Sequence, residues 1–173
     1  MTVIYELAKE NTNRIFPSEV RNMAEVIGEI IFGEDGEYMP EDEEFKNMMN
    51  ETPDEKSMYV ITNKARLFGA AAMLYEDNLH DLSQQIDSDL YILPSSVHEV
   101  IAISDKFGDA DELADMVYEV NMEQVSIEER LSNQVYHYDK EARTLRLATD
   151  KFDRKISDDI QDKTHQIEEG KAR

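Results

Sequence analysis

The sequence predicts an α+β fold in which N-terminal helices precede a mostly antiparallel sheet with packed helices. In roughly the first 50 residues, apolar positions recur at spacings of three and four, which is the period of an amphipathic helix. From residue 58 onward, most apolar residues fall in short runs bounded by turn-forming residues, as in strands. The chain has 173 residues, 40% of them hydrophobic, which suffices for one core. We expect one acidic domain over residues 1–148 and a charged helix or frayed tail over residues 149–173.

Three helices are expected in the N-terminal part. The first spans residues 3–15 and ends before Pro17, because proline does not continue a helix. The second begins at Ser18 and ends at Gly33, with apolar residues three and four apart between them. A third follows Pro40, because proline at the first helical position with acidic residues in the first turn is typical of a helix start.

The middle of the chain predicts strands and one short helix. Residues 58–62 and 67–75 read as two strands of a hairpin, because each is an apolar run and a turn-forming segment joins them. A short helix is expected over residues 79–86, where apolar residues recur with helical spacing. Two further apolar runs, at 90–93 and 97–104, are expected to be adjacent strands.

The clearest helix start in the second half is Asp109. Glu112 follows three residues later, which is the arrangement of a capping box. The expected apolar face of this helix consists of Leu113, Met116, Val117 and Val120. We predict that the helix near residues 110–121 packs on a sheet containing residues 89–103.

Two signals remain near the end of this domain. Ser126 and Glu129 repeat the spacing of the capping box and indicate another helix start. Residues 135–138 and 144–148 are apolar runs on either side of a short polar segment, which predicts a hairpin.

The charge is strongly negative and unevenly distributed. Against 18 lysines and arginines stand 39 aspartates and glutamates, for a net charge of -21. Residues 34–55 hold ten acids and one lysine, and residues 76–115 hold eleven acids and one lysine. Such a chain should repel nucleic acid and anionic membranes, because the phosphate attraction that drives such binding has the opposite sign. We therefore expect a basic protein partner and no direct binding to nucleic acid.

Composition also excludes several classes of site and location. The chain has no cysteine, so it has no disulfide, no thiolate nucleophile and no cysteine-based zinc site. It contains no run of 18 apolar residues, and its first residues lack the basic-then-apolar order of a signal peptide. We expect a cytoplasmic protein that does not bind membranes.

Several short segments resemble a known family in order and spacing. They are YVITN at 59–63, GAA at 69–71, DLYILPSSVHEVI at 89–101 and YHY at 136–138. With further pieces upstream, they are similar to an uncharacterised family of acidic domains from gut anaerobic Firmicutes, over roughly residues 3–138. Family members usually carry additional sequence before the part that matches Tyr5, so the resemblance implies the C-terminal half of such a protein. The family has no established activity and therefore implies no catalytic residue.

A second and weaker resemblance concerns size, charge and apparent origin. Short acidic single-domain proteins from the same bacteria and their mobile elements include anti-CRISPR inhibitors of the type II RNA-guided nuclease. This resemblance implies a non-enzymatic interaction protein that blocks a DNA-cutting nuclease, with or without its guide RNA.

The acidic residues are the candidate partner-binding site. Carboxylates on a folded scaffold can replace nucleic-acid phosphates in a basic groove. The same charges are also compatible with a solvated surface or with electrostatic stabilisation of helix starts. The candidates are Glu34, Asp35, Glu37, Glu41, Asp42, Glu43, Glu44, Asp105, Asp109 and Asp111.

One segment contains groups used in nucleophilic catalysis, namely Ser95, Ser96 and His98. Sequence neighbours rarely reach one another in the required geometry, and no nucleophile-elbow glycines flank the serines. A strand-joining turn explains the segment better, so we expect no catalytic residue. The alternative function is a small hydrolase or small-molecule binding module built around these groups.

A calcium loop is the second chemical possibility, because four aspartates lie close together in the sequence. They are Asp105, Asp109, Asp111 and Asp115. An EF-hand needs acids at loop positions 1, 3 and 5 and glycine at position 6, whereas here Gly108 precedes Asp109. We expect helix capping by Asp109, with no metal and no cofactor.

Overall fold

The structure is a computed structural model that describes residues 2–32, 56–94 and 96–149. Its centre is a six-stranded antiparallel sheet with the strand order β1-β2-β4-β3-β5-β6. The strands are β1 (Ser18–Asn22), β2 (Met58–Asn63), β3 (Leu90–Leu93), β4 (Val100–Ser104), β5 (Tyr136–Asp139) and β6 (Thr144–Leu147). The helices are α1 (Thr2–Ile15), α2 (Met23–Phe32), α4 (Glu76–Gln85) and α5 (Ala110–Glu123), with short 3-10 helices η2 (Gly69–Leu74) and η3 (Asp105–Phe107). The predicted α+β class is confirmed.

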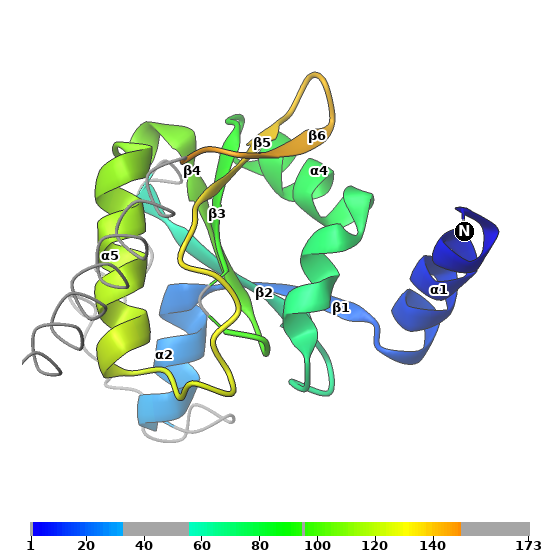
Figure 1. Ribbon diagram of the computed structural model, residues 1–173, viewed down its shortest axis with the longest axis horizontal. Helices are drawn as coiled ribbons and strands as arrows, with labels where there is room; N and C mark the ends of the chain where they lie inside the picture. Colours follow the sequence, from blue (N-terminus) through cyan, green and yellow to red (C-terminus); the bar gives the residue numbers. More distant parts are fainter. Residues whose placement is uncertain (1, 33–55, 95, 150–173) are drawn as a thin grey trace, which may run out of the picture.

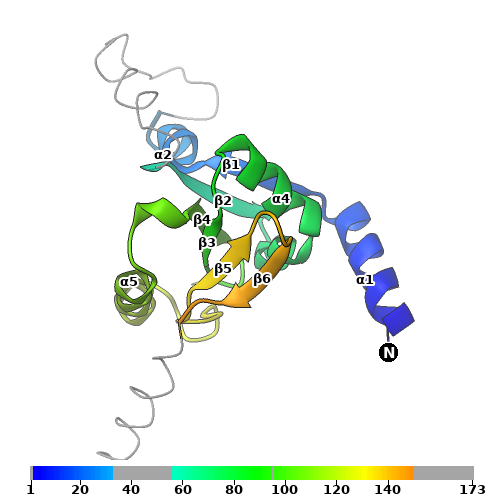
Figure 2. The same cartoon turned by 90° about the horizontal axis from the view of Figure 1, so that it is seen from above.

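Helices cover both faces of this sheet, as Figures 1 and 2 show. Because side chains alternate along a strand, Leu90 and Ile92 of β3 point to one face, where they pack with α4 and η2. Leu93 points to the other face and packs with Leu113 and Val117 of α5. The predicted packing of this helix on the sheet is confirmed. Helix α1 projects from the body beyond β1.

The apolar face of α5 is only partly buried. Leu113 and Val117 are buried, whereas Met116 and Val120 are 41% and 42% exposed. The last two residues line an apolar cavity of about 180 Å³ between α5 and the sheet. The predicted apolar face of this helix is therefore in the correct position, but the sheet buries only two of its four residues.

The prediction that the second helix begins at Ser18 is wrong. Residues Ser18–Asn22 form β1, which pairs antiparallel with β2 from Ser18 opposite Asn63 to Asn22 opposite Tyr59. Helix α2 starts directly after Asn22, whose Oδ1 accepts a hydrogen bond from the Ala24 backbone N–H at 2.8 Å. Asparagine in this role is a common helix cap, so the boundary had a local signal. The first helix agrees with the prediction.

The predicted strand over residues 67–75 is also wrong. Arg66 and Phe68 have positive φ angles of 52° and 50°, which interrupt an extended chain. The alanine-rich segment that follows forms η2, and β2 lies between β1 and β4 in place of the predicted hairpin. An apolar run of this length fits a buried helical turn as well as a strand.

Gly69 lies where no side chain fits. A Cβ atom at this position would overlap the Thr62 hydroxyl and the His98 carbonyl oxygen, and it would lie 2.8 Å from the Asn63 backbone nitrogen. The close approach lets the Thr62 hydroxyl donate a hydrogen bond to the His98 carbonyl at 2.8 Å. Gly69 therefore permits η2 to dock onto the end of β2.

The remaining predictions are mostly confirmed. The short helix is α4, β3 and β4 are adjacent, and β5 pairs with β6 as the predicted hairpin. Strand β4 begins at Val100, because the chain bends at Val97 and His98. The helix predicted from Ser126 is a single turn in which the backbone nitrogen of Glu129 donates to the Ser126 carbonyl.

Several predictions lie outside the described residues. These are the helix after Pro40, the acidic residues between Glu34 and Glu44, and the tail from residue 150. The domain boundary at residue 148 remains a prediction.

Asn121 is a buried polar link between α5 and the segment that leads to β5. Its side chain is fully buried, and its Nδ2 donates hydrogen bonds to the Ser132 carbonyl and to Asn133 Oδ1. We expect Asn121→Ala to destabilise the protein by about 2 kcal/mol, because two partly buried acceptors lose their donor. Urea unfolding checks this value, with Gln124→Ala on the exposed last turn as the control. Equal midpoints for the two variants would contradict it.

Candidate functional site

The acidic residues of the second half gather around α5. Residues 105–129 contain nine acids and one lysine. Helix α5 itself has five acidic residues and no basic one. Four of its acids recur at spacings of three, four and four, which places them along one side of the helix. We call Glu112, Asp115, Glu119 and Glu123 the acidic stripe; all four are exposed.

The structure places three predicted site residues at the N-terminal end of this helix. Asp105 opens η3 and is partly exposed, Asp109 is the N-cap of α5, and Asp111 lies in its first turn. Asp109 Oδ1 accepts hydrogen bonds from the backbone nitrogens of Asp111 at 2.9 Å and Glu112 at 3.4 Å. The predicted capping role is confirmed. The sequence analysis did not include Glu119 and Glu123 among the candidate residues, although their helical spacing from Asp115 can be read from the sequence.

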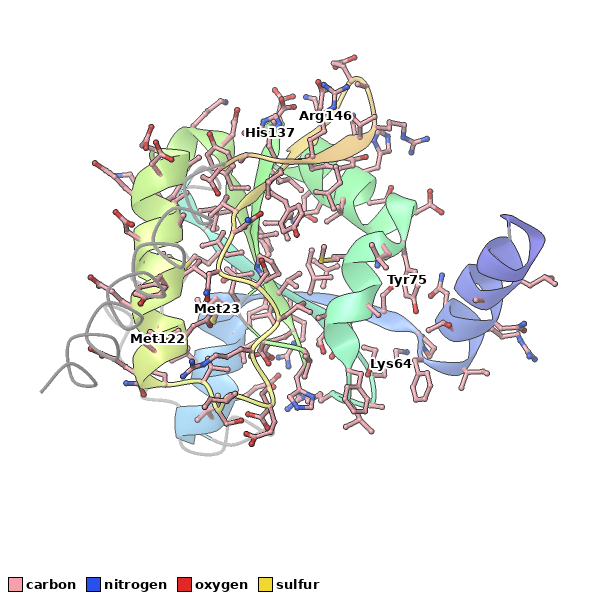
Figure 3. The ribbon with its side chains drawn as sticks, in the orientation of Figure 1. Met23, Lys64, Tyr75, Met122, His137 and Arg146 are labelled. Atoms are coloured by element: carbon pink, nitrogen blue, oxygen red, sulfur yellow. The ribbon has the colours of Figure 1, made fainter. Side chains whose placement is uncertain are left out.

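A second cluster lies on the same face of the sheet, where β3 begins and β4 ends. Its members are Asp89, Asp105 and His137, whose nearest side-chain donor atoms all lie within 4.8 Å of one another. His137 Nε2 is 3.5 Å from Asp89 Oδ2 and 4.0 Å from Asp105 Oδ2. Figure 3 shows His137 at the end of the sheet nearest the β5–β6 hairpin, across from Arg146 of β6. These residues lie just before β3, just after β4 and in β5, so their distance in the sequence hides the cluster from sequence analysis.

Each carboxylate of this cluster has one oxygen held from behind. Asp89 Oδ1 accepts from the Lys140 backbone N–H at 3.0 Å, and Asp105 Oδ1 accepts from the Ser88 hydroxyl at 2.8 Å. Ser88 is buried and lies 2.7 Å from the equally buried Ser104 hydroxyl. The carboxylates are thereby fixed with Oδ2 towards His137.

The pKa of Tyr91 reflects both its burial and the negative charges near it. Burial raises the pKa of Tyr91, and the charges of Asp105 and Asp109 raise it further. Its ring meets the His137 ring edge-on, with 5.6 Å between centroids. The phenol therefore stays neutral at physiological pH and supports the imidazole from the side.

His98 does not form a nucleophile and base pair with Ser96. The Ser96 hydroxyl accepts a hydrogen bond from the His98 backbone N–H at 3.0 Å, as in a turn. The ring Nδ1 accepts from the Phe68 backbone N–H at 3.3 Å, and Nε2 is 3.6 Å from Glu129 Oε1. A ring that accepts at Nδ1 carries its proton at Nε2, facing Glu129. Ser95 lies outside the described residues.

A polar cavity of about 490 Å³ lies on the opposite face of the sheet, lined by residues of β1, the start of α2, and α4. Charged and amide side chains line much of it, including Arg21, Asn22, Glu25, Asp81 and Gln85. Arg21 is paired with Glu29 of α2, and this pairing raises the pKa of the guanidinium. The cavity can hold a small polar molecule.

Among the residues that the structure describes, no helix has the length and apolar character needed to cross a membrane.

Comparison with curated proteins and with solved structures gives no match. Residues 1–140 match the model of a family of unknown function, DUF5688. This match confirms the expected membership of a family without an established activity. With 140 of its 173 residues matched, the chain belongs to the DUF5688 family of unknown function.

Proposed function

We propose that this protein is a non-enzymatic interaction module that binds a basic, nucleic-acid-binding protein through the face of α5. The observation that carries the proposal is the acidic stripe on a helix that has no basic residue. The stripe extends over about 16 Å, at 1.5 Å per residue. Its carboxylates recur about every 5.5 Å along the axis, compared with one phosphate per 3.4 Å along a DNA strand. The row of charges is therefore sparser than a phosphate backbone, but it has the same sign and runs in one direction, as a backbone does in a basic groove.

Local stability does not explain the whole stripe. Negative charge in the first turn stabilises a helix, which accounts for Asp111 and Glu112. Glu123 lies at the opposite end, where the helix dipole disfavours it by about 0.3–1 kcal/mol and where the last turn has no basic residue. The position of Glu123 therefore lacks an explanation in helix stability, and this supports a role in binding.

The narrower form of the proposal is inhibition of a DNA-cutting bacterial nuclease, most specifically the type II RNA-guided nuclease with or without its guide RNA. A carboxylate surface would compete with DNA for the basic channel of such an enzyme. Its support is the size and charge of the chain, because the family has no established activity.

The test is a double charge reversal, Glu119→Lys with Glu123→Lys, which changes the net charge from -21 to -17, two units per substitution. Inhibition of DNA cleavage by the RNA-guided nuclease is measured at 50 and 200 mM salt. We expect the variant to inhibit about tenfold less well at low salt, and the wild type to weaken steeply at high salt. Duplex DNA in excess should displace the wild-type protein from the nuclease.

A matched control is Asp81→Lys with Glu99→Lys, two exposed acids away from α5 that give the same net charge. We expect it to inhibit within about threefold of wild type. Equal losses in both variants would show that only net charge matters. No binding of the wild type to the nuclease would exclude this partner. Because Glu123→Lys relieves an unfavourable dipole interaction, loss of inhibition should come without loss of stability.

A second candidate function, small-molecule binding, is favoured by the polar cavity beside β1. Its lining of amides with Arg21, Glu25 and Asp81 suits a small polar ligand with several hydroxyl or amino groups. Chemical-shift changes confined to Asn22 and Gln85 on addition of such a ligand would support it. A hydrolase that uses His98 is less well supported than small-molecule binding. The two ring nitrogens of His98 face the Phe68 backbone N–H and the Glu129 carboxylate, and among the described residues neither faces a serine hydroxyl.

A further inference from the structure

Beyond partner binding, the strand-end cluster has the composition of a metal-ligand set. We propose that Asp89, Asp105 and His137 bind a divalent cation at the end of the sheet beside η3. Asp89 directly precedes β3, Asp105 directly follows β4, and His137 lies in β5. One donor atom of each lies within 4.8 Å of the others. This donor set differs from a surface patch of acids, because it combines oxygen and nitrogen ligands in one place.

The free oxygens and the ring nitrogen point to a common centre. Asp89 Oδ1 and Asp105 Oδ1 are occupied by hydrogen bonds from Lys140 and Ser88, so Oδ2 of each remains towards His137 Nε2. Hydrogen bonds of this kind behind the ligands orient carboxylates in known metal sites. The hydroxyl that holds Asp105 belongs to a residue that is only 4% exposed, so the support is part of the core.

The distances are compatible with a shared cation after a small contraction. Ligands about 2.1 Å from a tetrahedral zinc ion lie about 3.4 Å apart. The distance from His137 Nε2 to Asp89 Oδ2 is 3.5 Å, which already fits, and that to Asp105 Oδ2 is 4.0 Å. A small rotation of the Asp105 carboxylate would shorten the second distance by about half an ångström, while the Asp105 backbone N–H stays bonded to the Asp89 carbonyl at 3.0 Å.

The charges around the cluster also favour a cation. Two carboxylates face one imidazole, so the cluster itself carries more negative than positive charge. The Lys140 ammonium, which is attached to the backbone that holds Asp89, is paired with Asp87 at 2.7 Å. A bound divalent ion would offset the repulsion between Asp89 and Asp105.

The donor types select the kind of ion. An imidazole with two carboxylates suits Zn²⁺ and Mn²⁺, whereas Mg²⁺ and Ca²⁺ prefer all-oxygen sites. For one site of this kind, affinity rises from Mn²⁺ to Zn²⁺. We therefore expect Zn²⁺ to bind more tightly than Mn²⁺, and Mg²⁺ to bind weakly. Three protein ligands leave at least one position for water.

The test measures binding of ZnCl₂ and MnCl₂ to the full chain by calorimetry, together with the melting temperature. We expect one Zn²⁺ per chain and a rise in melting temperature of at least about 5 °C at a concentration about 100 times Kd. Asp105→Asn and His137→Gln should each weaken Zn²⁺ binding at least tenfold. Asp111→Asn and His98→Gln are the controls, because they make the same types of substitution at residues outside the cluster. Both should bind Zn²⁺ within about twofold of wild type.

Circular dichroism without metal establishes that each variant folds, and Asp89→Asn replaces any ligand variant that does not. Absence of saturable Zn²⁺ binding by the wild type would overturn the proposal. So would wild-type affinity in folded His137→Gln, because diffuse attraction of cations to an acidic surface would then account for the binding. The variant Glu119→Lys with Glu123→Lys keeps all three proposed metal ligands, so it tests partner binding independently of Zn²⁺ binding.

Discussion

Replacing Gly69 by alanine is expected to lower the melting temperature by about 6–12 °C, which corresponds to about 3 kcal/mol for a protein of this size. The added methyl group would overlap the Thr62 hydroxyl and the His98 carbonyl, and it would lie 2.8 Å from the Asn63 nitrogen. Two of these three atoms belong to the backbone and cannot rotate away. The hydrogen bond between Thr62 and His98 is therefore expected to break as η2 moves off β2.

Gly108→Ala is the matched control, because no atom lies within 4 Å of a Cβ at that position. Its backbone is extended, with φ of 178°, which alanine adopts without strain. We expect a change within about 0.5 kcal/mol. Thermal melts of both variants decide the matter: similar melting temperatures would show that η2 does not approach β2 as closely as described.

Leu90→Ala is expected to reduce the free energy of unfolding by about 3 kcal/mol, because it removes a fully buried side chain from the central strand β3. Leu90 lies between Ser104 of β4 and Tyr138 of β5, so few neighbours can move in to fill the space. Urea unfolding with an unchanged m-value is the appropriate measurement.

Leu147→Ala provides the comparison on a strand at the sheet edge, where the leucine is 44% exposed. We expect a cost below about 1 kcal/mol, since only part of the side chain leaves the apolar environment. A cost for Leu90→Ala no greater than that for Leu147→Ala would contradict the position of β3 at the centre of the core.

Local patterns predicted the elements that have one clear period and one clear boundary. Asp109 with its following acids marked the start of α5, and the apolar run at 90–93 marked β3. The two errors arose where a short segment fitted both periods. Val20 and Met23 are three apart and imitated a helix, but pairing with β2 made Ser18–Asn22 a strand. Tertiary pairing of this kind leaves little trace in a five-residue stretch.

The candidate sites divide in the same way. The acidic stripe depends only on spacing within one helix, so it was open to prediction from Glu112 onward. The cluster of Asp89, Asp105 and His137 depends on the pairing of β3 with both β4 and β5. Asp89 and His137 are 48 positions apart, so no short segment of the sequence contains all three residues. Local composition also does not determine the order of strands in a sheet. The calcium-loop hypothesis examined Asp105 with its sequence neighbours and therefore missed its neighbours in space.

The order of the strands places β1 and β6 at the two edges of the sheet that the structure describes, with five and four residues respectively. Each edge carries charge: Glu19 and Arg21 on β1, and Arg146 on β6. Short, charged edges disfavour the addition of a strand from another molecule. Together with the mutual repulsion of copies that each carry a charge of -21, they oppose edge-to-edge aggregation. At high concentration we therefore expect little self-association at either edge of the described sheet, and the partner proposed for α5 would not have to compete with strand pairing there.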